Sequence, residues 1–298
     1  MENINLVTLL DRYNTDDRCR DALEAIRWPS GVACLRCGDT SVSEITTRHV
    51  WACGGCGYRF SVTAGTIMHR SHLPLRKWFL AIYLMCESKK GMSANQLKRS
   101  LGVQYKTAWH LCHRIREAMG NDPCTGPTLV GIVEMDQTLV GGKAEGKGKD
   151  WRDNKTWVAG AIERGGKIRI ERIPNIKKGT IHDFVKRNIS DEADAIYTDE
   201  LRSHVGLETD TRKHESVNHS KEEWVVGDVH TNSVEGVWSL FKRSIVGSFH
   251  KMSLKHMDRY LEELEWRFNN RGNPYIFQNA LRRIMNTHPL EYRTLVAD

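Results

Sequence analysis

The stretch Thr128-Leu-Val-Gly-Ile-Val-Glu-Met-Asp-Gln-Thr-Leu-Val140 carries the pattern from which the fold can be predicted. Most of its residues are apolar or β-branched, which is typical of a strand in the interior of a protein. Glu134 and Asp136 lie two residues apart, so both side chains project from the same face of that strand. The strand therefore presents two carboxylates to the elements that pack on that face.

The residues after this strand predict a mixed sheet. Two β-rich stretches, 157–162 and 167–173, flank Gly165-Gly166 and predict a hairpin. Apolar residues at helical spacing predict a helix from Thr180 to Ile189, and further short strands are expected at 194–199 and 212–217. Three strands, a helix, a strand, a short helix, a strand and a helix make up the order of a ribonuclease-H-like fold.

The last helix of this order is predicted by His230-Thr-Asn-Ser-Val-Glu-Gly-Val-Trp-Ser-Leu-Phe-Lys-Arg243. One of the polar residues at 231–233 is expected to cap its free N–H groups. Glu235 falls in or near the first turn, where a carboxylate suits the helix dipole. Lys242 follows about two turns later and therefore shares a face with Glu235.

Three carboxylates fall on three different elements of this order. Asp136 lies on the first strand, Asp199 at the end of the fourth and Glu235 on the following helix, with 62 and then 35 residues between them. In mixed sheets, sites gather where the connections from strand ends diverge. Mg²⁺ and Mn²⁺ prefer oxygen ligands, and a pair of such ions assists phosphoryl transfer. The three residues therefore predict a catalytic two-metal site.

Two pairs of cysteines give the most specific signal in the first half of the chain. Cys34-Leu-Arg-Cys37 and Cys53-Gly-Gly-Cys56 are C-x₂-C knuckles with fifteen residues between them, the spacing of a tetrahedral zinc site. A glycine follows each knuckle and permits the tight turn that brings backbone N–H groups toward sulfur. Because four thiolates leave no open coordination position, the predicted Zn²⁺ is structural.

Helical patterns flank the predicted zinc ribbon. Residues 3–27 predict two short helices broken near 13–17. Residues 74–120 predict three helices, the last two separated by a turn of three to four residues, which is the helix-turn-helix layout. The alternative for this region is a basic three-helix packing module.

The charge of this region favours DNA contact. Residues 69–116 contain ten Lys and Arg residues and a single acid, and such a stripe suits a phosphate backbone. The side chains expected to contact DNA begin the last helix and are Gln104, Tyr105, Lys106 and Thr107. Farther along, Lys143 in a Gly/Lys-rich loop is expected to contact phosphates without sequence specificity.

Composition limits the class of protein. The 298 residues are 40% hydrophobic, which allows two or three domains with cores, and the net charge of +7 favours a polyanionic partner. No apolar run of about 18 residues is present, and the N-terminus lacks a signal-peptide pattern. We therefore expect a cytoplasmic, nucleoid-associated protein without a membrane partner. In that compartment the eight cysteines favour metal binding or burial over disulfides.

Nearly the whole chain resembles bacterial insertion-sequence transposases that join an N-terminal zinc ribbon and helix-turn-helix to a DDE catalytic domain. Beyond the four cysteines, the resemblance is carried by Phe60–Thr66, Leu75–Ala81, Tyr105–Trp109, Glu134–Asp136, Val140–Lys143, Thr198-Asp199, Val217–His219, His230–Glu235 and Arg267–Asn270. The segment Glu200–His204 departs from the family pattern, so the sequence assigns no role to His204.

The resemblance implies a transposase that binds the inverted-repeat ends of its element and target DNA, and that cleaves and transfers strands as a homo-oligomer in a synaptic complex. It implies that Asp136, Asp199 and Glu235 bind Mg²⁺ or Mn²⁺ and that Lys242 is an auxiliary residue. Asn232 is the alternative third residue, because some relatives use Asn there. His230 is a further candidate for contact with the scissile phosphate.

The predicted organisation is α+β with several domains. It consists of an N-terminal helical segment at 1–30, a zinc ribbon at 31–68, a helix-turn-helix region at 69–122, and a ribonuclease-H-like domain with C-terminal helices at 126–298. Two other functional classes stay open. One is a DNA-binding regulator with an inert catalytic domain, and the other is a ribonuclease-H-like, structure-specific nuclease.

Overall fold

The computed structural model describes residues 4–120, 129–141, 155–218, 225–250 and 252–297. The chain divides into two compact units. Unit 1 comprises Met1–Ser88, Met92–Asn121 and Asn273–Asp298, and unit 2 comprises Lys89–Gly91 and Asp122–Gly272. Within the described ranges, none of the helices has the length and apolar character needed to cross a membrane.

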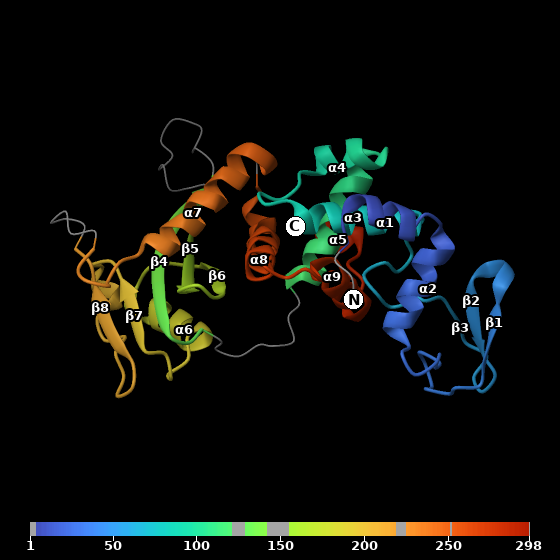
Figure 1. Cartoon of the computed structure of the whole chain (residues 1–298), viewed down its shortest axis with the longest axis horizontal. Helices are drawn as coiled ribbons and strands as arrows, with labels where there is room; N and C mark the ends of the chain where they lie inside the picture. The colour runs from blue at the N-terminus through green and yellow to red at the C-terminus, as the bar shows by residue number, and fades with distance from the viewer. Residues whose placement is uncertain (1–3, 121–128, 142–154, 219–224, 251, 298) are drawn as a thin grey trace. The chain divides into compact units, whose positions relative to one another are not determined.

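Unit 1 is mainly helical and carries one small antiparallel sheet of order β1-β2-β3 (Figure 1). Its elements are α1 (Leu6–Arg12), α2 (Asp16–Arg27), β1 (Val42–Ile45), the 3₁₀ helix η1 (Thr46–Arg48), β2 (Val50–Cys53), β3 (Arg59–Phe60), α3 (Leu75–Glu87), α4 (Ala94–Leu101), α5 (Tyr105–Gly120), α9 (Ile276–Asn286) and α10 (Tyr292–Val296). The two short N-terminal helices and their break, predicted from the sequence, are confirmed.

Helix α2 packs against the zinc ribbon. Arg27, near its end, donates hydrogen bonds to the carbonyls of Val62 and Ala64, the latter at 2.7 Å. The indole N–H of Trp51 on β2 donates to Glu24 at 3.1 Å. These bonds join the helix and the ribbon into one module, although a boundary near residue 30 was expected from the sequence.

The last two helices predicted in residues 74–120 and the short turn between them are confirmed. Ser93 Oγ accepts the N–H of Gln96 at 3.1 Å and so caps α4. The helix ends at Gly102, whose φ of +59° is a left-handed conformation that glycine adopts without strain. Helix α5 begins three residues later, at Tyr105.

The C-terminal residues pack within unit 1. Phe277 of α9 is buried, and its ring centroid lies 5.8 Å from that of Phe79 and 6.2 Å from that of Tyr83, both on α3. Arg283 donates to the carbonyl of Met119 at 2.8 Å. These residues were expected to belong to the ribonuclease-H-like domain at 126–298; in the structure the apolar face of α9 is buried on α3 and α5 instead.

Unit 2 is built on a five-stranded sheet of order β6-β5-β4-β7-β8. β4 pairs antiparallel with β5 and parallel with β7, β5 pairs antiparallel with β6, and β8 is parallel to β7. The elements are β4 (Ile132–Gly141), β5 (Lys155–Glu163), β6 (Ile168–Ile173), α6 (Lys178–Asn188), β7 (Ala195–Thr198), the 3₁₀ helix η2 (Arg202–His204), β8 (Lys213–Ser216), α7 (Asn232–Ser244), the π-helical turn η4 (Ile245–Phe249), the 3₁₀ turn η5 (Leu254–His256) and α8 (Met257–Asn269). This order confirms the predicted ribonuclease-H-like arrangement.

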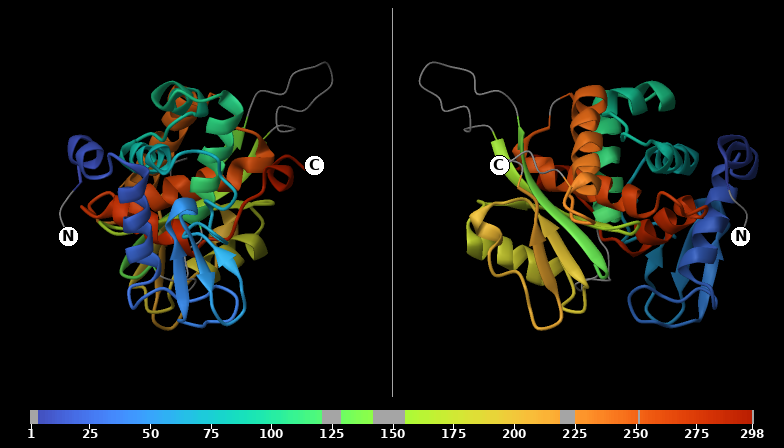
Figure 2. Two further views of the ribbon diagram at one scale, coloured as in Figure 1. Left: turned by 90° about the vertical axis from the view of Figure 1, so that its right-hand side faces the viewer. Right: turned by 60° about the vertical axis from the view of Figure 1, so that its left-hand side comes forward.

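The two faces of the sheet bury different helices (Figure 2). One face packs Val133 and Met135 of β4 against Phe184 of α6. The other packs Val158 of β5 against Phe241 of α7 and further residues of α8. Since side chains alternate along β4, Glu134 and Asp136 project toward the α7 face.

Helix α8 covers the edge strand β6. The side chain of Asn269 accepts the N–H of Ile168 at 2.7 Å and donates to its carbonyl at 3.0 Å, and Glu265 accepts the N–H of Ile170 at 2.8 Å. An uncovered edge strand exposes unpaired backbone groups. These side chains pair them and fix α8 on the sheet.

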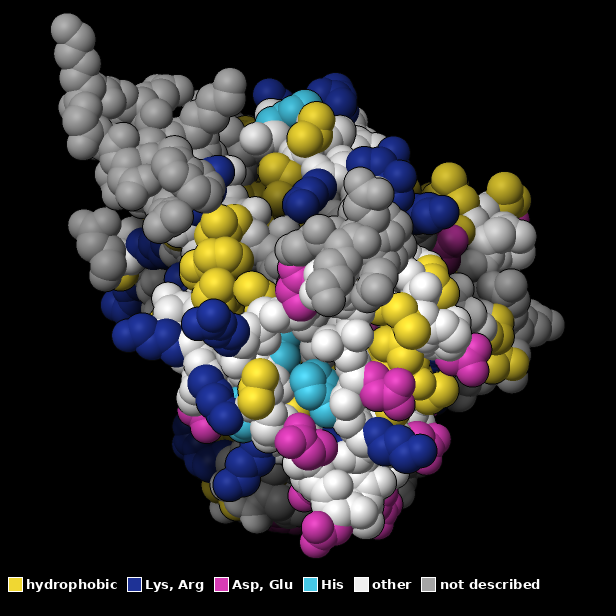
Figure 3. Space-filling view, turned by 90° about the vertical axis from the view of Figure 1, so that its left-hand side faces the viewer, with side chains coloured by type: hydrophobic (Ala, Val, Ile, Leu, Met, Phe, Trp, Pro, Cys, Tyr) yellow, Lys and Arg dark blue, Asp and Glu magenta, His cyan; other side chains and the backbone are white. Residues whose placement is uncertain are grey.

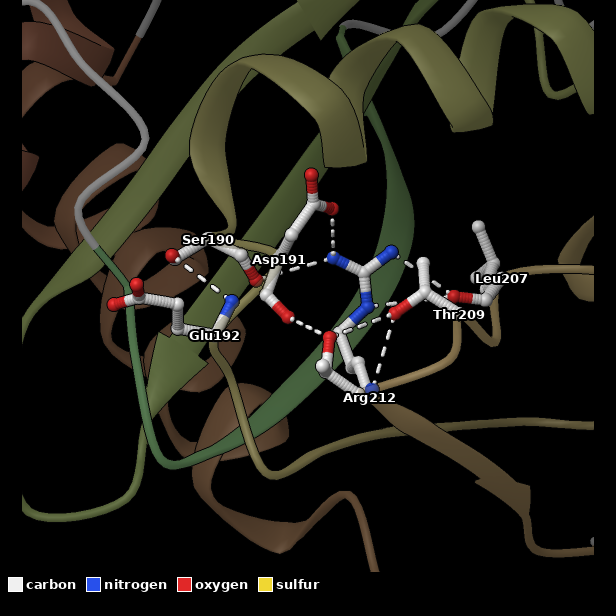
Figure 4. Close-up of polar contacts among 7 residues, drawn as sticks. Ser190, Asp191, Glu192, Leu207, Thr209 and Arg212 are labelled. Carbon is white, nitrogen blue, oxygen red and sulfur yellow. Dashed lines mark hydrogen bonds and ion pairs between the residues drawn. The ribbon is translucent and has the colours of Figure 1, made fainter.

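A buried arginine holds the connections that precede β7 and β8 (Figure 4). The guanidinium of Arg212 donates to the carbonyl of Leu207 at 3.0 Å and to the carbonyl of Ser190 at 3.1 Å. It also pairs with the Asp191 carboxylate at 3.2 Å. The network ties the segment that follows η2 to the end of α6, away from the strand end that carries Asp199.

Candidate functional site

The four predicted zinc ligands lie together. The ligand atoms of Cys34, Cys37, Cys53 and Cys56 are all within 4.8 Å of one another. Backbone N–H groups point at two of the sulfurs, from Arg36 to Cys34 and from Cys56 to Cys53, each at 3.4 Å. The first knuckle precedes β1, and the second spans the turn from β2 to β3.

The electrostatics of this cluster favour the thiolate form of one cysteine, Cys34. Burial opposes ionisation of Cys34, but hydrogen bonds from the backbone of Cys37 and Arg36 and from neighbouring thiols lower its pKa to about 6. At the two exposed cysteines, backbone hydrogen bonds from Asp39 and Tyr58 lower the pKa, but neighbouring thiols and burial outweigh them, and raise the pKa of Cys37 to about 12 and also that of Cys56. Zinc binds the thiolate form of cysteine. Four clustered sulfurs served by backbone donors therefore fit a structural Zn²⁺.

Asp136 and Glu235 line one cavity of about 680 Å³ in unit 2. Asp136 projects from β4, and Glu235 lies in the first turn of α7. Trp238, Lys242 and Arg243 of α7 line the same cavity. Glu235 and Lys242 are exposed, so both are available to a ligand from solvent.

The environment of Asp136 disfavours its charge. Burial, together with the negative charges of Asp199 and Glu235, raises the pKa of Asp136 to about 6, against hydrogen bonds from the Gln137 backbone and the Trp238 indole. The Trp238 N–H donates to Asp136 Oδ2 at 2.9 Å. A bound cation would offset the repulsion among these three carboxylates and favour the charged form of Asp136.

Asp199 follows the last residue of β7 and is held by a histidine. Nδ1 of His204 lies 2.9 Å from Asp199 Oδ1, and the backbone N–H of Leu201 donates to the same oxygen at 3.3 Å. Histidine side chains gather on one face of the molecule (Figure 3). In unit 2, burial lowers the pKa of His214, and the nearby His204 lowers that pKa further.

Glu134 caps helix α7. Its buried carboxylate accepts the backbone N–H groups of Ser233 at 2.7 Å and Val234 at 3.2 Å, and pairs with Arg164 at 2.8 Å. A side chain at 231–233 was expected to cap this helix. That expectation is wrong for the N-cap residue Thr231, whose side chain makes no capping hydrogen bond. Thr231 Oγ1 donates to Glu235 at 3.0 Å instead.

The remaining residues predicted for the site lie as follows. Asn232 is the first residue of α7 and is exposed. His230 Nδ1 lies 3.2 Å from Glu134, so its described contact is to that acid. Lys143 falls outside the described residues. Among the residues that the structure describes, only the four cysteines bring three or more potential ligand atoms within 4.8 Å; the carboxylates are more widely spaced.

The residues predicted to contact DNA are exposed at the start of α5. Gln104, Tyr105, Lys106 and Thr107 all face solvent, and three of them line a cavity of about 690 Å³ in unit 1. Tyr292 of α10 also lines it, with its ring centroid 4.4 Å from Lys106 Nζ. The sequence gives no signal that the C-terminal segment reaches this helix.

Several residues of the carboxylate site were missed by the sequence analysis. Trp238 is buried on α7 and its indole N–H bonds to Asp136, a contact that the helical pattern does not predict. Gln137 is buried and contacts His204. Arg164 supplies the charge that balances Glu134. The one available signal was that Gln137 directly follows Asp136 in the strand.

A ribonuclease-H-like domain with a carboxylate-lined cavity, joined in one chain to a zinc ribbon, defines the class of zinc-ribbon transposases. The ISXO2-like transposase domain family matches residues 128–269, and the transposase zinc-ribbon domain family matches residues 14–59. The second match includes α2, in agreement with the bonds between α2 and the ribbon. The chain belongs to the insertion-sequence transposases with an ISXO2-like transposase domain.

Individual relatives agree with this assignment. The chain is 30% identical over 253 residues to a Halobacterium salinarum protein described as an uncharacterized protein in transposable element ISH50, covering 78% of this chain and 83% of that protein. An uncharacterized transposase-like protein of Haemophilus influenzae is 29% identical over 98 residues, covering 33% of this chain and 77% of that protein. Among solved structures, the Mos1 strand transfer complex has a TM-score of 0.30 at 12% identity, covering 70% of this chain and 75% of that chain, a likeness too weak to add detail.

Proposed function

We propose that this transposase binds the ends of its insertion sequence and catalyses metal-dependent DNA cleavage and strand transfer, with Asp136, Asp199 and Glu235 as the catalytic carboxylates. The observation that carries the proposal is the shared environment of the three acids. Asp136 and Glu235 line one cavity, and the charges of Asp199 and Glu235 both act on Asp136.

The donor set suits a hard divalent cation. All three residues offer carboxylate oxygen, which Mg²⁺ and Mn²⁺ prefer. The raised pKa of Asp136 reflects burial and uncompensated negative charge, both of which oppose its ionised form. When bound, such ions would activate the attacking oxygen and stabilise the leaving oxygen. Since the three acids do not lie within ligand distance of one common point, we expect cation and DNA to draw them together.

The residues around the carboxylates have distinct proposed tasks. Lys242 lines the same cavity as Asp136 and is exposed, so its ammonium group is available to a DNA phosphate. The third metal-binding position is assigned to Glu235 rather than to Asn232. Glu235 lines the cavity, and its charge contributes to the raised pKa of Asp136. His230 is proposed to support α7, because its Nδ1 lies 3.2 Å from the Glu134 carboxylate that caps this helix.

The proposed reaction has two steps at one site. Water attacks the phosphodiester at an element end, the bond to the 3′ oxygen breaks, and a 3′-hydroxyl is left. That hydroxyl then attacks a phosphodiester of target DNA, so the bond broken in the target is replaced by one to the element end. Catalysis consists of positioning and charge stabilisation, without a covalent protein intermediate.

Unit 1 is proposed to recognise the DNA. The exposed polar side chains at the start of α5 face solvent in a helix-turn-helix, and such residues read base edges in the major groove. The zinc ribbon at 31–68, held by structural Zn²⁺, is the second DNA-binding module, and 126–272 forms the catalytic part. Pairing two element ends would take at least two copies of the chain.

An assay on DNA carrying the element's inverted-repeat ends tests the proposal against its two alternatives. The proposal predicts nicking at the ends and joined products with target DNA in the presence of Mg²⁺ or Mn²⁺. End binding without cleavage would support a DNA-binding regulator. Cleavage without any joined product would support a structure-specific nuclease.

A further inference from the structure

His204 lies in the interior of unit 2 with both ring nitrogens engaged. It ends the 3₁₀ helix η2 and is 1% exposed. Nδ1 lies 2.9 Å from Asp199 Oδ1 and 3.2 Å from the carbonyl oxygen of the same residue. On the opposite side of the ring, Nε2 lies 3.0 Å from Nε2 and 3.2 Å from Oε1 of Gln137.

The chemistry of these partners fixes the orientation of the imidazole. A carboxylate and a carbonyl oxygen only accept hydrogen bonds, so Nδ1 of His204 carries the proton that it donates to Asp199. In a neutral imidazole, Nε2 then accepts, and the side-chain amide of Gln137 is the donor. The imidazole ring is therefore held by hydrogen bonds on two sides. Its hydrogen bond to Asp199 fixes the rotamer of the Asp199 side chain.

This contact links Asp199 to the strand that carries Asp136. Gln137 directly follows Asp136 on β4 and projects to the other face of the sheet. The side chains of Gln137, His204 and Asp199 form a continuous bridge from β4 to the end of β7. One oxygen of Asp199 is occupied by His204 and by the N–H of Leu201, which leaves the other oxygen for a ligand.

We propose that His204 is a positioning residue that holds the Asp199 carboxylate in the orientation required to bind a divalent cation, braced by Gln137. The inference rests on the proposed function of Asp199. Hydrogen bonds to metal-binding side chains set their orientation, and their loss weakens metal affinity by about 10- to 100-fold. A role in stability alone would leave the affinity of the folded protein unchanged.

Two substitutions at His204 separate positioning from packing. His204→Phe keeps an aromatic ring but removes both polar contacts, whereas His204→Asn retains a side-chain N–H near the place of Nδ1. Mn²⁺ binding to the zinc-loaded full chain is measured by calorimetry, with the melting temperature of each variant. We expect His204→Phe to weaken Mn²⁺ binding about 10- to 100-fold. His204→Asn keeps the contact to Asp199 but loses the one to Gln137, so we expect it to weaken binding less than His204→Phe does.

Two further variants keep the test decisive. Gln137→Leu removes the other end of the bridge, and we expect weaker Mn²⁺ binding even if His204→Phe fails to fold. Arg212→Lys is the structural control, because it disturbs the network that follows η2 without touching Asp199. It should lower the melting temperature and leave Mn²⁺ affinity unchanged.

The outcomes distinguish this inference from the proposed function. If Asp136→Ala abolishes Mn²⁺ binding while His204→Phe and Gln137→Leu bind as tightly as the wild type, the positioning role is overturned and the carboxylate assignment stands. If Asp136→Ala binds Mn²⁺ like the wild type, the carboxylate assignment fails, and the role of His204 fails with it.

Discussion

The indole N–H of Trp238 donates a hydrogen bond to the Asp136 carboxylate at 2.9 Å, and so joins α7 to β4 directly at the proposed site. Trp238 fits there because Gly160 on β5, paired with Asp136 in the sheet, has no side chain. A Cβ at position 160 would lie 2.5 Å from Cη2 and 2.7 Å from Cζ2 of the indole. The position of the acid therefore depends on the absence of one carbon atom.

Gly160→Ala is expected to displace Trp238 and to impair DNA cleavage. Overpacking of this kind costs about 1–3 kcal/mol of unfolding free energy, measured by urea denaturation, and loss of the indole bond shifts Asp136. The control is Gly179→Ala in α6, where an added Cβ meets nothing within 4 Å. That variant should be at least as stable as the wild type. Normal cleavage by Gly160→Ala would contradict the role given to Trp238.

Asp136→Asn is expected to stabilise the metal-free protein above pH 6. Burial, together with the charges of Asp199 and Glu235, raises the pKa of Asp136 to about 6, whereas the unfolded value is about 3.9. Between these values the folded state binds more protons, so stability falls as the pH rises through that window. Asparagine removes this dependence and should gain up to about 3 kcal/mol at pH 8.

The check is the melting temperature of both proteins across pH in the presence of a Mg²⁺ chelator that spares structural zinc. The difference between variant and wild type should be largest near pH 8 and approach zero below about pH 3, where Asp136 is protonated in both states. An equal difference in melting temperature at the two ends of the pH range would show that the surroundings of Asp136 do not raise its pKa.

Glu134→Gln is expected to destabilise unit 2 strongly. The buried carboxylate balances Arg164 and accepts two N–H groups of α7, and breaking a buried ion pair costs about 3–5 kcal/mol. The matched control is Asp258→Asn, which breaks the exposed pair with Arg172 and should cost about 1 kcal/mol or less. Chemical denaturation measures both, and similar losses would argue against the capping role of Glu134.

Zinc content should follow the four cysteines of the ribbon and no others. Cys37→Ala is expected to lose the bound Zn²⁺, because three thiolates and a gap no longer complete the tetrahedral site. Cys86→Ala in α3 is the control, since Cys86 is buried outside the cluster. Metal analysis of the purified variants measures the ratio of zinc to chain. Retention of a full equivalent by Cys37→Ala would contradict the assignment.

The sequence predicted the fold order because local patterns carry it. Cysteine spacing defined the ribbon, alternation and the Gly165-Gly166 turn defined the β5–β6 hairpin, and helical spacing defined α6. The return of α9 to unit 1 was not predicted. Its amphipathic pattern requires an apolar partner but cannot say that the partner is α3, nearly 200 residues earlier in the chain.

The three carboxylates of the proposed site could be proposed from the sequence, but the residues that hold them in place could not. Asp136, Asp199 and Glu235 follow from fold order, because each lies at a defined place on an element. Glu134 as a helix cap and His204 as a partner of Asp199 depend on contacts between residues 99 and five positions apart in the chain. Side-chain contacts of this kind are set by tertiary packing, which leaves no periodic signal.

The central claim is tested most directly by strand cleavage on inverted-repeat ends with Asp136→Asn, Asp199→Asn and Glu235→Gln, alongside Asn232→Ala. Each carboxylate variant should lose at least about 100-fold in cleavage rate while binding the ends with wild-type affinity. Asn232→Ala should cleave at a rate close to that of the wild type. Normal cleavage by any of the three carboxylate variants would contradict the account, and cleavage lost in Asn232→Ala but kept in Glu235→Gln would assign the third position to Asn232.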